Sequence, residues 1–244
     1  MRGTATNVRQ LLRLMAVGAL LTCQSCTNKS KVTVHQPGSK SKPVSKPGFE
    51  RGRQPPKMVV DSHLTLAQAV AGTRAPRGWT QRLAIVTVTY LGFDKLRHQG
   101  QLVVDKRLAS EIKSIFLEIE QARYPVQRIV PVVLYGWDDQ TSVGCNNTSS
   151  FNYRHKIIPG QKSQRLSVHA YGRAIDLNPF YNPYVASDGT SDQPYDKKHP
   201  AALVAASAPV RIFARHGWSW GGNWSGAKDY QHFEKVLPPV TSGD

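Results

Sequence analysis

Apolar residues after residue 57 occur both in continuous β-branched runs and at helical spacing, and these patterns predict strands and helices. The β-branched, apolar run over 83–91 is typical of a strand. After Asp105 the apolar residues recur about every 3.6 positions, which places them on one face of a helix. Pro125 ends this predicted helix, whose apolar face comprises Leu108, Ile112, Ile115, Phe116 and Ile119. The pattern therefore predicts a strand followed by an amphipathic helix.

Shorter elements are expected in the remainder of the chain. The apolar segment 128–135 favours a strand, which Pro131 restricts to an edge or a bulge, and a loop rich in Asn, Ser and Thr follows over 138–150. A second helix is predicted over Ala201–His216, with Gly217 closing it. Short strands are expected at Leu166–His169, Ala174–Leu177, Trp218–Trp220 and Tyr230–Val236. Helices and strands that do not alternate regularly favour the α+β class.

The first 57 residues differ in composition from the rest of the chain. Three arginines accompany a short apolar stretch over 14–21, as in an export signal, and this stretch is shorter than the roughly 20 apolar residues that span a bilayer. Cys23 stands where a bacterial lipoprotein carries its lipidated cysteine, although Thr22 replaces the usual smaller residue. We expect a lipid on Cys23, and cleavage without a lipid or an uncleaved anchor are the alternatives. The predicted parts are a signal segment, a linker and one folded domain, over 1–26, 27–57 and 58–244.

Most of the excess charge lies in the same N-terminal part. The chain carries 32 Lys and Arg against 16 Asp and Glu, while 40% of its residues are hydrophobic, which excludes a wholly disordered chain. The segment 27–57 is rich in Lys, Ser and Pro and has few bulky apolar residues, so an extended, solvated linker is expected. Its charge can serve solubility, or it can bind anionic polymers or lipid headgroups of the cell envelope. No aromatic residues alternate with these lysines, so nucleic acid is not an expected partner.

Residues with metal-binding and acid–base chemistry are concentrated in two short segments. The first is SVHAYGRAID, over 167–176, and the second is DYQHFE, over 229–234. Together they offer two imidazoles and one carboxylate, a zinc-binding set that leaves a fourth position open for water, as catalytic zinc sites do. The candidate ligands are His169, Asp176 and His232.

Two further residues in these segments bear on the predicted chemistry. Gly172 permits a tight turn, so His169 and Asp176 could point at one centre from adjoining strands. Asp229, three residues before His232, is a second carboxylate that could take a proton from the water. Histidine and aspartate are common residues, so ordinary solvated or hydrogen-bonded side chains are the alternative for each of them. The tryptophans nearby are expected in the core or in the wall of a groove: Trp218, Trp220 and Trp224.

The pattern S-x-H-x-x-G-x-A-x-D, followed by D-x-x-H-F-E, resembles the VanY-like family of D-alanyl-D-alanine carboxypeptidases and L-alanyl-D-glutamate endopeptidases. The similarity extends to FNYR at 151–154, to NPFYNPY at 178–184, and to the stretch from Leu91 to Val104 with the helix after it. The resemblance covers about 85–236. It implies an α+β fold like that of Hedgehog and DD-peptidase domains, with a small antiparallel sheet that carries the zinc site and packs against helices.

The resemblance also implies a role for each matching residue. It implies Zn²⁺ as the cofactor. Asp229 matches the general base, and Arg154 matches a residue that binds substrate and polarises the carbonyl under attack. Ser167 could contact substrate or support the ligands, and Glu234 could support the ligands without binding the metal itself. Cys145 departs from the pattern, and a thiol near the metal is the alternative for that residue. The ligands implied are the three already found from the residue types: His169, Asp176 and His232.

These observations predict a zinc peptidase of the cell envelope that hydrolyses peptidoglycan stem peptides. A D,D-carboxypeptidase and an endopeptidase would share the same residues, so both stay open. The alternative is a module that binds zinc and cell-wall peptide without turnover, which would have no need of Asp229 and Arg154 together. We expect peptidoglycan as the partner, anchoring to a membrane through the lipid on Cys23, no nucleic acid, and a monomer.

Overall fold

A three-stranded sheet and one long helix build the first half of the described chain. The computed structural model describes residues 58–158, 161–191 and 193–238. In the sheet, β1 (Val59–Val60) runs parallel to β3 (Arg97–Asp105), and β3 pairs with the antiparallel β2 (Leu83–Leu91). The bounds of β2 are those that the sequence predicts. The predicted export signal and linker lie outside the described residues.

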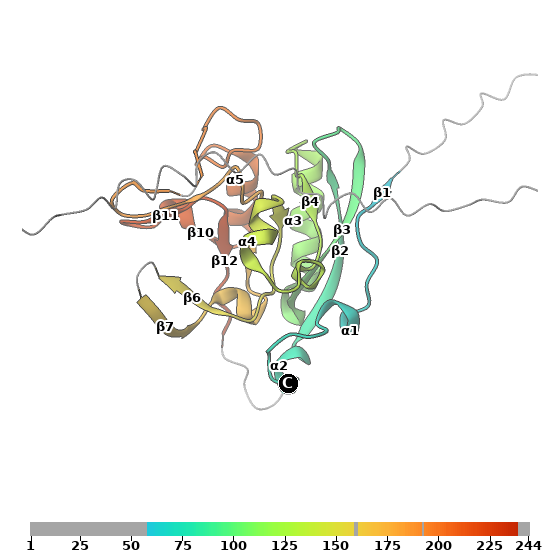
Figure 1. Ribbon diagram of the computed structural model, residues 1–244. Helices are drawn as coiled ribbons and strands as arrows, with labels where there is room; N and C mark the ends of the chain where they lie inside the picture. Colours follow the sequence, from blue (N-terminus) through green and yellow to red (C-terminus); the bar gives the residue numbers. More distant parts are fainter. Residues whose placement is uncertain (1–57, 159–160, 192, 239–244) are drawn as a thin grey trace, which may run out of the picture. The chain divides into compact units, whose positions relative to one another are not determined.

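The predicted amphipathic helix is present and packs against β2. Asp105 accepts the backbone N–H of Arg107 and so begins a 3₁₀ turn, η2 (Lys106–Leu108), which continues into α3 (Ala109–Gln121). Figure 1 shows α3 between the sheet of β2 and β3 and the strands near the C-terminus. The helix buries the predicted apolar residues, because their spacing keeps them on the face toward the core: Ile112, Ile115, Phe116 and Ile119.

A second sheet completes the core. Its strands β8 (Ala174–Asp176), β10 (Ser219–Trp220) and β12 (His232–Glu234) are antiparallel and lie in the order β10–β12–β8. Helix α5 (Ala208–Arg215) covers it, with the ring of Phe213 stacked on Phe233 at 4.1 Å between centroids. Small sheets packed with helices confirm the α+β class.

Short elements connect the two sheets, and among the described residues there are also two-stranded ladders. One ladder joins β6 (His155–Ile158) to β7 (Gln161–Leu166), and another joins β9 (Tyr184–Val185) to β11 (Lys228–Asp229). Short helical turns occur at α1 (Leu66–Ala69), α2 (Arg77–Thr80) and η5 (Gly221–Asn223).

The prediction of one strand over 128–135 is wrong beyond its first two residues. Strand β4 (Arg128–Ile129) pairs in parallel with β5 (Asn147–Thr148), and Pro131 then begins the 3₁₀ turn η3 (Val132–Tyr135). Proline has no N–H to donate to a ladder, so the strand cannot continue through it.

The loop expected over 138–150 contains a helix. Asp138 accepts the N–H of Thr141 at 2.7 Å and caps α4 (Asp139–Gly144). Polar residues of this kind favour helix starts as well as loops, because their side chains bond to free backbone N–H groups. The segment expected as a loop therefore begins with a helix, which Asp138 caps.

Other expected elements are shorter than predicted. The helix expected over Ala201–His216 begins only after Ser207, since Pro209 fits the first turn of α5. The strand expected over Tyr230–Val236 is limited to β12, and that expected at Leu166–His169 ends at Leu166. Val168–Tyr171 form the 3₁₀ turn η4 instead.

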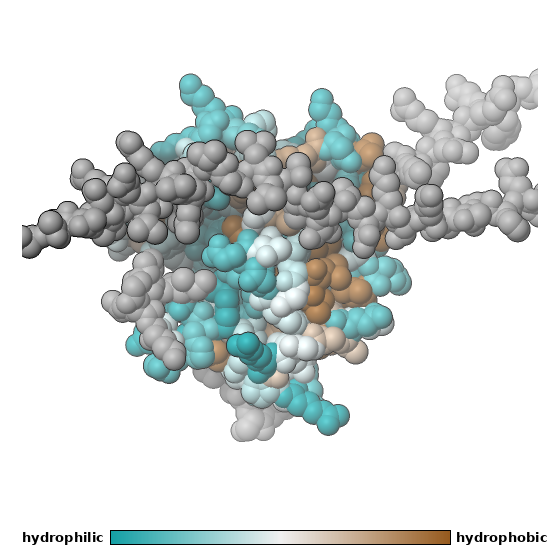
Figure 2. All heavy atoms as spheres, in the orientation of Figure 1, coloured by the Kyte–Doolittle hydropathy of each residue, from teal (hydrophilic) through white to brown (hydrophobic). Residues whose placement is uncertain are grey.

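Apart from the part covered by grey atoms, the face in Figure 2 is mainly hydrophilic or neutral, and hydrophobic residues gather on its right side, toward β2 and β3. None of the helices among the described residues is long and apolar enough to cross a membrane.

Candidate metal centre and active-site cleft

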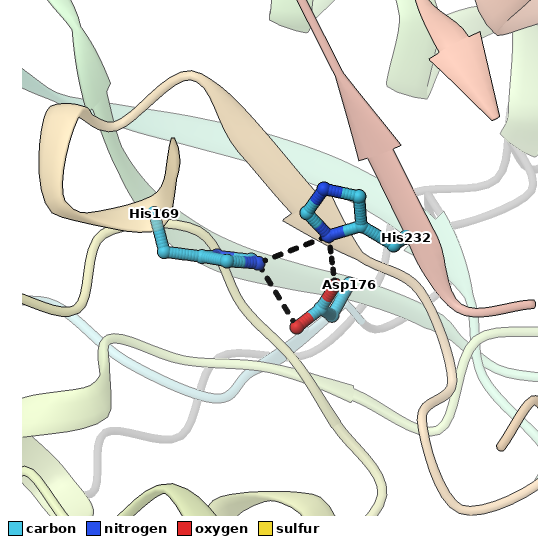
Figure 3. A group of neighbouring side chains, drawn as sticks. All are labelled: His169, Asp176 and His232. Atoms are coloured by element: carbon cyan, nitrogen blue, oxygen red, sulfur yellow. Dashed lines mark hydrogen bonds and ion pairs between the residues drawn. The ribbon is translucent and has the colours of Figure 1, made fainter. Parts of the chain in front are cut away.

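Three side chains from separate elements converge on one buried point (Figure 3). His169 Nε2 lies 3.1 Å from an oxygen of Asp176, and His232 Nδ1 lies 3.0 Å from the other oxygen. The two histidine nitrogens are 3.2 Å apart. All three residues are at most 6% exposed. The structure thus brings together the three residues that the sequence proposes as ligands.

The register of the second sheet places two of the three. His232 in β12 pairs directly with Asp176 in β8, so their side chains leave the same face of adjacent strands. His169 comes from the turn η4, and not from an adjoining strand as predicted. The Oγ of Ser167 accepts the N–H of His169 and begins this turn, which Gly172 ends with a positive φ of 64°. Ser167 therefore positions the first histidine.

Gly172 is required for a second reason, which is the close approach of the chain to β3. A Cβ at residue 172 would lie 2.7 Å from the backbone nitrogen of Asp105 and 2.8 Å from the carbonyl carbon of Val104. The N–H of Asp105 donates to the Gly172 carbonyl at 2.8 Å, and the N–H of Asn152 donates to the carbonyl of His169 at 3.2 Å. The turn that carries His169 is therefore attached to the first half of the fold.

Each histidine uses its second nitrogen to fix its orientation. His169 Nδ1 donates to the carbonyl of Ser150 at 2.6 Å, so Nε2 carries the lone pair that faces the centre. His232 Nε2 lies 3.2 Å from Glu234 Oε2, which leaves Nδ1 toward the centre. A histidine ligand needs this arrangement, because an outer acceptor fixes the tautomer and raises the basicity of the nitrogen that binds the metal.

The electrostatics of the group favour a cation at its centre. Burial alone would raise the pKa of Asp176, but the adjacent imidazoles hold that pKa well below its usual range. Burial would lower the pKa of His232, yet the hydrogen bonds with Asp176 and Glu234 raise it to about 10. The carboxylate of Asp176 thus favours a positive charge beside it, which a protonated imidazole supplies here. A metal cation bound between the three side chains would supply the same positive charge. The donor set of two nitrogens and a carboxylate suits zinc.

Asp229 lies beside this group, in β11 opposite Tyr184 of β9. Burial, together with the nearby charge of Asp176, raises the pKa of Asp229 to about 6. Its Oδ1 is buried and makes no hydrogen bond within the described residues. Gly221 allows the approach, since a Cβ there would lie 2.4 Å from the carbonyl oxygen of Asp229. The predicted base thus has one oxygen, Oδ1, that makes no hydrogen bond within the described residues and lies in the cleft of the centre.

A cleft of about 400 Å³ contains the group and the other predicted site residues. Arg154 and Ser167 line it, together with the three candidate ligands and Asp229. Trp224 also lines it, 5.4 Å from the ring of His232, as a groove wall. Trp218 and Trp220 are core residues. Cys145 is disulfide-bonded and does not belong to the group, so it offers no free thiolate to a metal there.

Sequence patterns did not identify some of the residues in the cleft. Asp139 lines it and forms an ion pair with Arg154, with Arg154 Nη2 3.2 Å from Asp139 Oδ2. Tyr184 lines it as an exposed aromatic side chain. Asp139 stands in a segment interpreted as a loop, and only the three-dimensional pairing connects it to the site. For Tyr184, its position in the segment NPFYNPY after the first motif was an available signal.

Comparison with known families agrees with this geometry. Residues 161–235 match the model of a family described as D-alanyl-D-alanine carboxypeptidase. The resemblance to the VanY-like family is confirmed over this segment. The match to the VanY-like family includes all three candidate ligands, Ser167 and Asp229, while Arg154 precedes it. It supports a peptidase. None of the curated proteins and none of the solved structures compared with the chain gives a significant match.

Proposed function

We propose that this protein is a zinc-dependent peptidase that hydrolyses the stem peptides of peptidoglycan. The observation that carries the proposal is the convergence of His169, Asp176 and His232 in a cleft where Asp229 offers a buried, unpaired oxygen. The family match over 161–235 supports the same reaction class. Both a D,D-carboxypeptidase and an endopeptidase fit this arrangement.

The residues at the centre fit a zinc ion with an open coordination position. Two imidazole nitrogens and one carboxylate are the ligands, and each imidazole is oriented by an acceptor on its far side. When bound there, zinc would lower the pKa of a water molecule toward about 7 and polarise the carbonyl under attack. The low pKa of Asp176 keeps that ligand ionised across the physiological range.

Asp229 is the proposed general base. Its oxygen accepts the proton of the attacking water and later delivers that proton to the leaving amine. A base works best when its pKa lies near the working pH, and burial raises the pKa of Asp229 to about 6. A module that only binds peptide has no use for a buried carboxylate with an unpaired oxygen, so Asp229 favours an enzyme over the binding module.

Arg154 and Ser167 are the proposed substrate-binding residues. The guanidinium of Arg154 can bind a carboxylate or the negative charge that develops on the attacked carbonyl oxygen. Ser167 lines the cleft while its Oγ accepts the N–H of His169, so it combines contact with substrate and support of the ligand turn.

We also infer the wider context that the residues imply. We propose that the sheet β10–β12–β8 is the small antiparallel sheet expected for a fold like that of Hedgehog and DD-peptidase domains. We propose a location in the cell envelope, with an export signal over 1–26, a lipid on Cys23 and the basic linker 27–57 between the anchor and the domain. Peptidoglycan is the proposed partner of a monomeric protein.

Digestion of purified peptidoglycan by the zinc-loaded protein tests the proposal, with released fragments identified by mass. Release of free D-alanine indicates a carboxypeptidase, and shortened or separated stem peptides indicate an endopeptidase. Asp229→Ala is the control, because it keeps all three ligands. Intact peptidoglycan after digestion with wild-type protein of full zinc content would contradict the proposed function.

A further inference from the structure

Arg154 is bound within the cleft by a carboxylate that the sequence motifs do not include. We propose that Asp139 is a positioning residue, which orients the guanidinium of Arg154 so that its outer edge faces the substrate. The proposal rests on the proposed function and adds to it the residue that makes Arg154 an ordered binding group.

The contact between the two residues has two points. Arg154 Nε lies 3.2 Å from Asp139 Oδ1, and Arg154 Nη2 lies 3.2 Å from Asp139 Oδ2. This pair uses the side edge of the guanidinium, which carries five N–H donors in one plane. Within the described part of the chain, Nη1 makes no hydrogen bond. The edge of the guanidinium that includes Nη1 is therefore available to bind a carboxylate or a carbonyl oxygen.

Both partners are attached to the rest of the site. Asp139 stands in the first turn of α4, and its Oδ1 also accepts Asn152 Nδ2 at 3.0 Å. The carbonyl of Arg154 accepts the N–H of Ser167 at 2.9 Å, and Ser167 in turn begins the turn of His169. The ion pair is therefore fixed relative to the candidate ligands through short, direct connections.

The charges of the cleft explain why such a partner is needed. Asp176, Asp229 and Glu234 line the same cleft as Arg154. A guanidinium without a partner would be attracted to these carboxylates and would compete with a metal cation or occupy the proposed base. The pair with Asp139 gives the guanidinium of Arg154 a carboxylate partner that is neither a candidate ligand nor the proposed base. Lysine could not replace arginine here, because its single ammonium group has no second planar edge with which to bind substrate while it pairs with Asp139.

Two variants of the same helix test the role of Asp139. Asp139→Asn removes the charge that binds Arg154, and Asp138→Asn removes the neighbouring charge while keeping a residue that can cap α4. The substrate is a soluble disaccharide pentapeptide from peptidoglycan, which contains the bonds of both candidate activities. Loss of a charge-assisted contact is expected to lower kcat/KM of Asp139→Asn by about ten- to a hundred-fold. Asp138→Asn is expected to match the wild type, with both proteins at full zinc content.

A double-variant comparison separates positioning from a general structural effect. If Asp139 acts through Arg154, Asp139→Asn has no further effect on kcat/KM in an Arg154→Ala background, and Asp139→Glu restores part of the activity. If kcat/KM of the Asp139→Asn, Arg154→Ala double variant falls by the product of the two single-variant effects, the residues act independently and the proposal is overturned. A wild-type kcat/KM in Asp139→Asn would overturn it as well. A wild-type protein that cleaves nothing overturns the proposed function instead, and the role of Asp139 toward substrate falls with it.

Discussion

Asp176 lies directly opposite His232 across the β8–β12 ladder, and its Oδ1 is 3.0 Å from His232 Nδ1. Cross-strand neighbours are the closest side chains that two strands can offer, so the ladder itself sets the separation of two candidate ligands. A register shift of one residue would turn one of them to the other face of the sheet. The metal centre thus depends on the correct pairing of two three-residue strands.

His169→Ala is expected to abolish stable zinc binding, because two ligands remain of the three. We expect about one zinc ion per wild-type chain and far less in the variant, measured by elemental analysis after dialysis against a weak chelator. His155→Ala is the matched control, since His155 is an exposed histidine of β6 outside the candidate ligand group. Full zinc in His169→Ala would exclude this residue as a ligand.

Asp229→Ala is expected to lower the rate of hydrolysis by about 10²- to 10⁴-fold, the usual contribution of general-base assistance. Zinc content and substrate affinity should remain near those of the wild type, because the ligands and Arg154 are unchanged. Asp229→Glu should keep part of the activity, since it retains a carboxylate. A zinc-loaded Asp229→Ala protein that works at the parental rate would leave Glu234 as the next carboxylate to test.

Glu234→Gln is expected to weaken zinc binding by about 10- to 100-fold, because Glu234 holds the outer nitrogen of His232. Competition with a chelator of known affinity measures the change. Glu111→Gln provides a comparison, since Glu111 bonds Lys235 and Trp218 and does not line the cleft. Equal affinities in Glu234→Gln and wild type would show that the sheet alone orients His232.

Asp105→Asn is expected to reduce the free energy of unfolding by about 2–3 kcal/mol at neutral pH. Burial would raise the pKa of Asp105, but the hydrogen bonds from Arg107 and Arg173 hold it below 3.8. A depressed pKa contributes stability above about pH 4, and this contribution is lost as pH falls through the folded-state value. Urea unfolding at several pH values should therefore show a penalty that shrinks in acid. A penalty independent of pH would contradict the assignment, and Asp196→Asn, on an exposed loop, is the control.

Deletion of 28–57 is expected to weaken association with anionic envelope polymers at low salt. The segment holds eight of the basic residues and one acidic residue, and attraction between exposed charges is screened as ionic strength rises. Sedimentation with isolated cell walls at two salt concentrations measures the effect. If the deletion variant sediments with cell walls at low salt as the full chain does, the basic residues of the linker do not bind the wall and the linker acts only as a spacer.

The sequence predicts the parts of this fold in which local pattern and burial agree. The strand Leu83–Leu91 follows from its β-branched, apolar composition and helix α3 from periodicity, and the three candidate ligands follow from residue types and spacing. The short elements could not be predicted in the same way. The two-residue strands β4 and β10 exist because of partners far along the chain, and no local pattern specifies such pairing.

The site residues divide in the same manner. Asp229 belongs to the recognised motif DYQHFE, so the sequence identifies it. Asp139 belongs to no motif, and only the fold shows that it pairs with Arg154, 15 positions away in sequence. Likewise, the turn at His169 was expected to be a strand, because Gly172 signalled a bend but not the 3₁₀ turn that precedes it. The 3₁₀ turn begins because the Ser167 hydroxyl accepts the N–H of His169. The sequence alone does not show this hydrogen bond, since a serine fits the end of a strand as well as the start of a turn.

The attachment of the Gly172 turn to β3 means that the candidate ligands belong to two different layers of the molecule. His169 is tied through Asp105 to the first sheet, while Asp176 and His232 belong to the second. An ion bound by all three residues would link the two sheets directly. Its binding free energy would then add to the free energy of unfolding of the whole domain. At a free-zinc concentration a hundred times the dissociation constant, the gain is about 2.7 kcal/mol. The melting temperature of the domain would then rise with the concentration of free zinc, and the metal-free domain would unfold and be cleaved by proteases more readily.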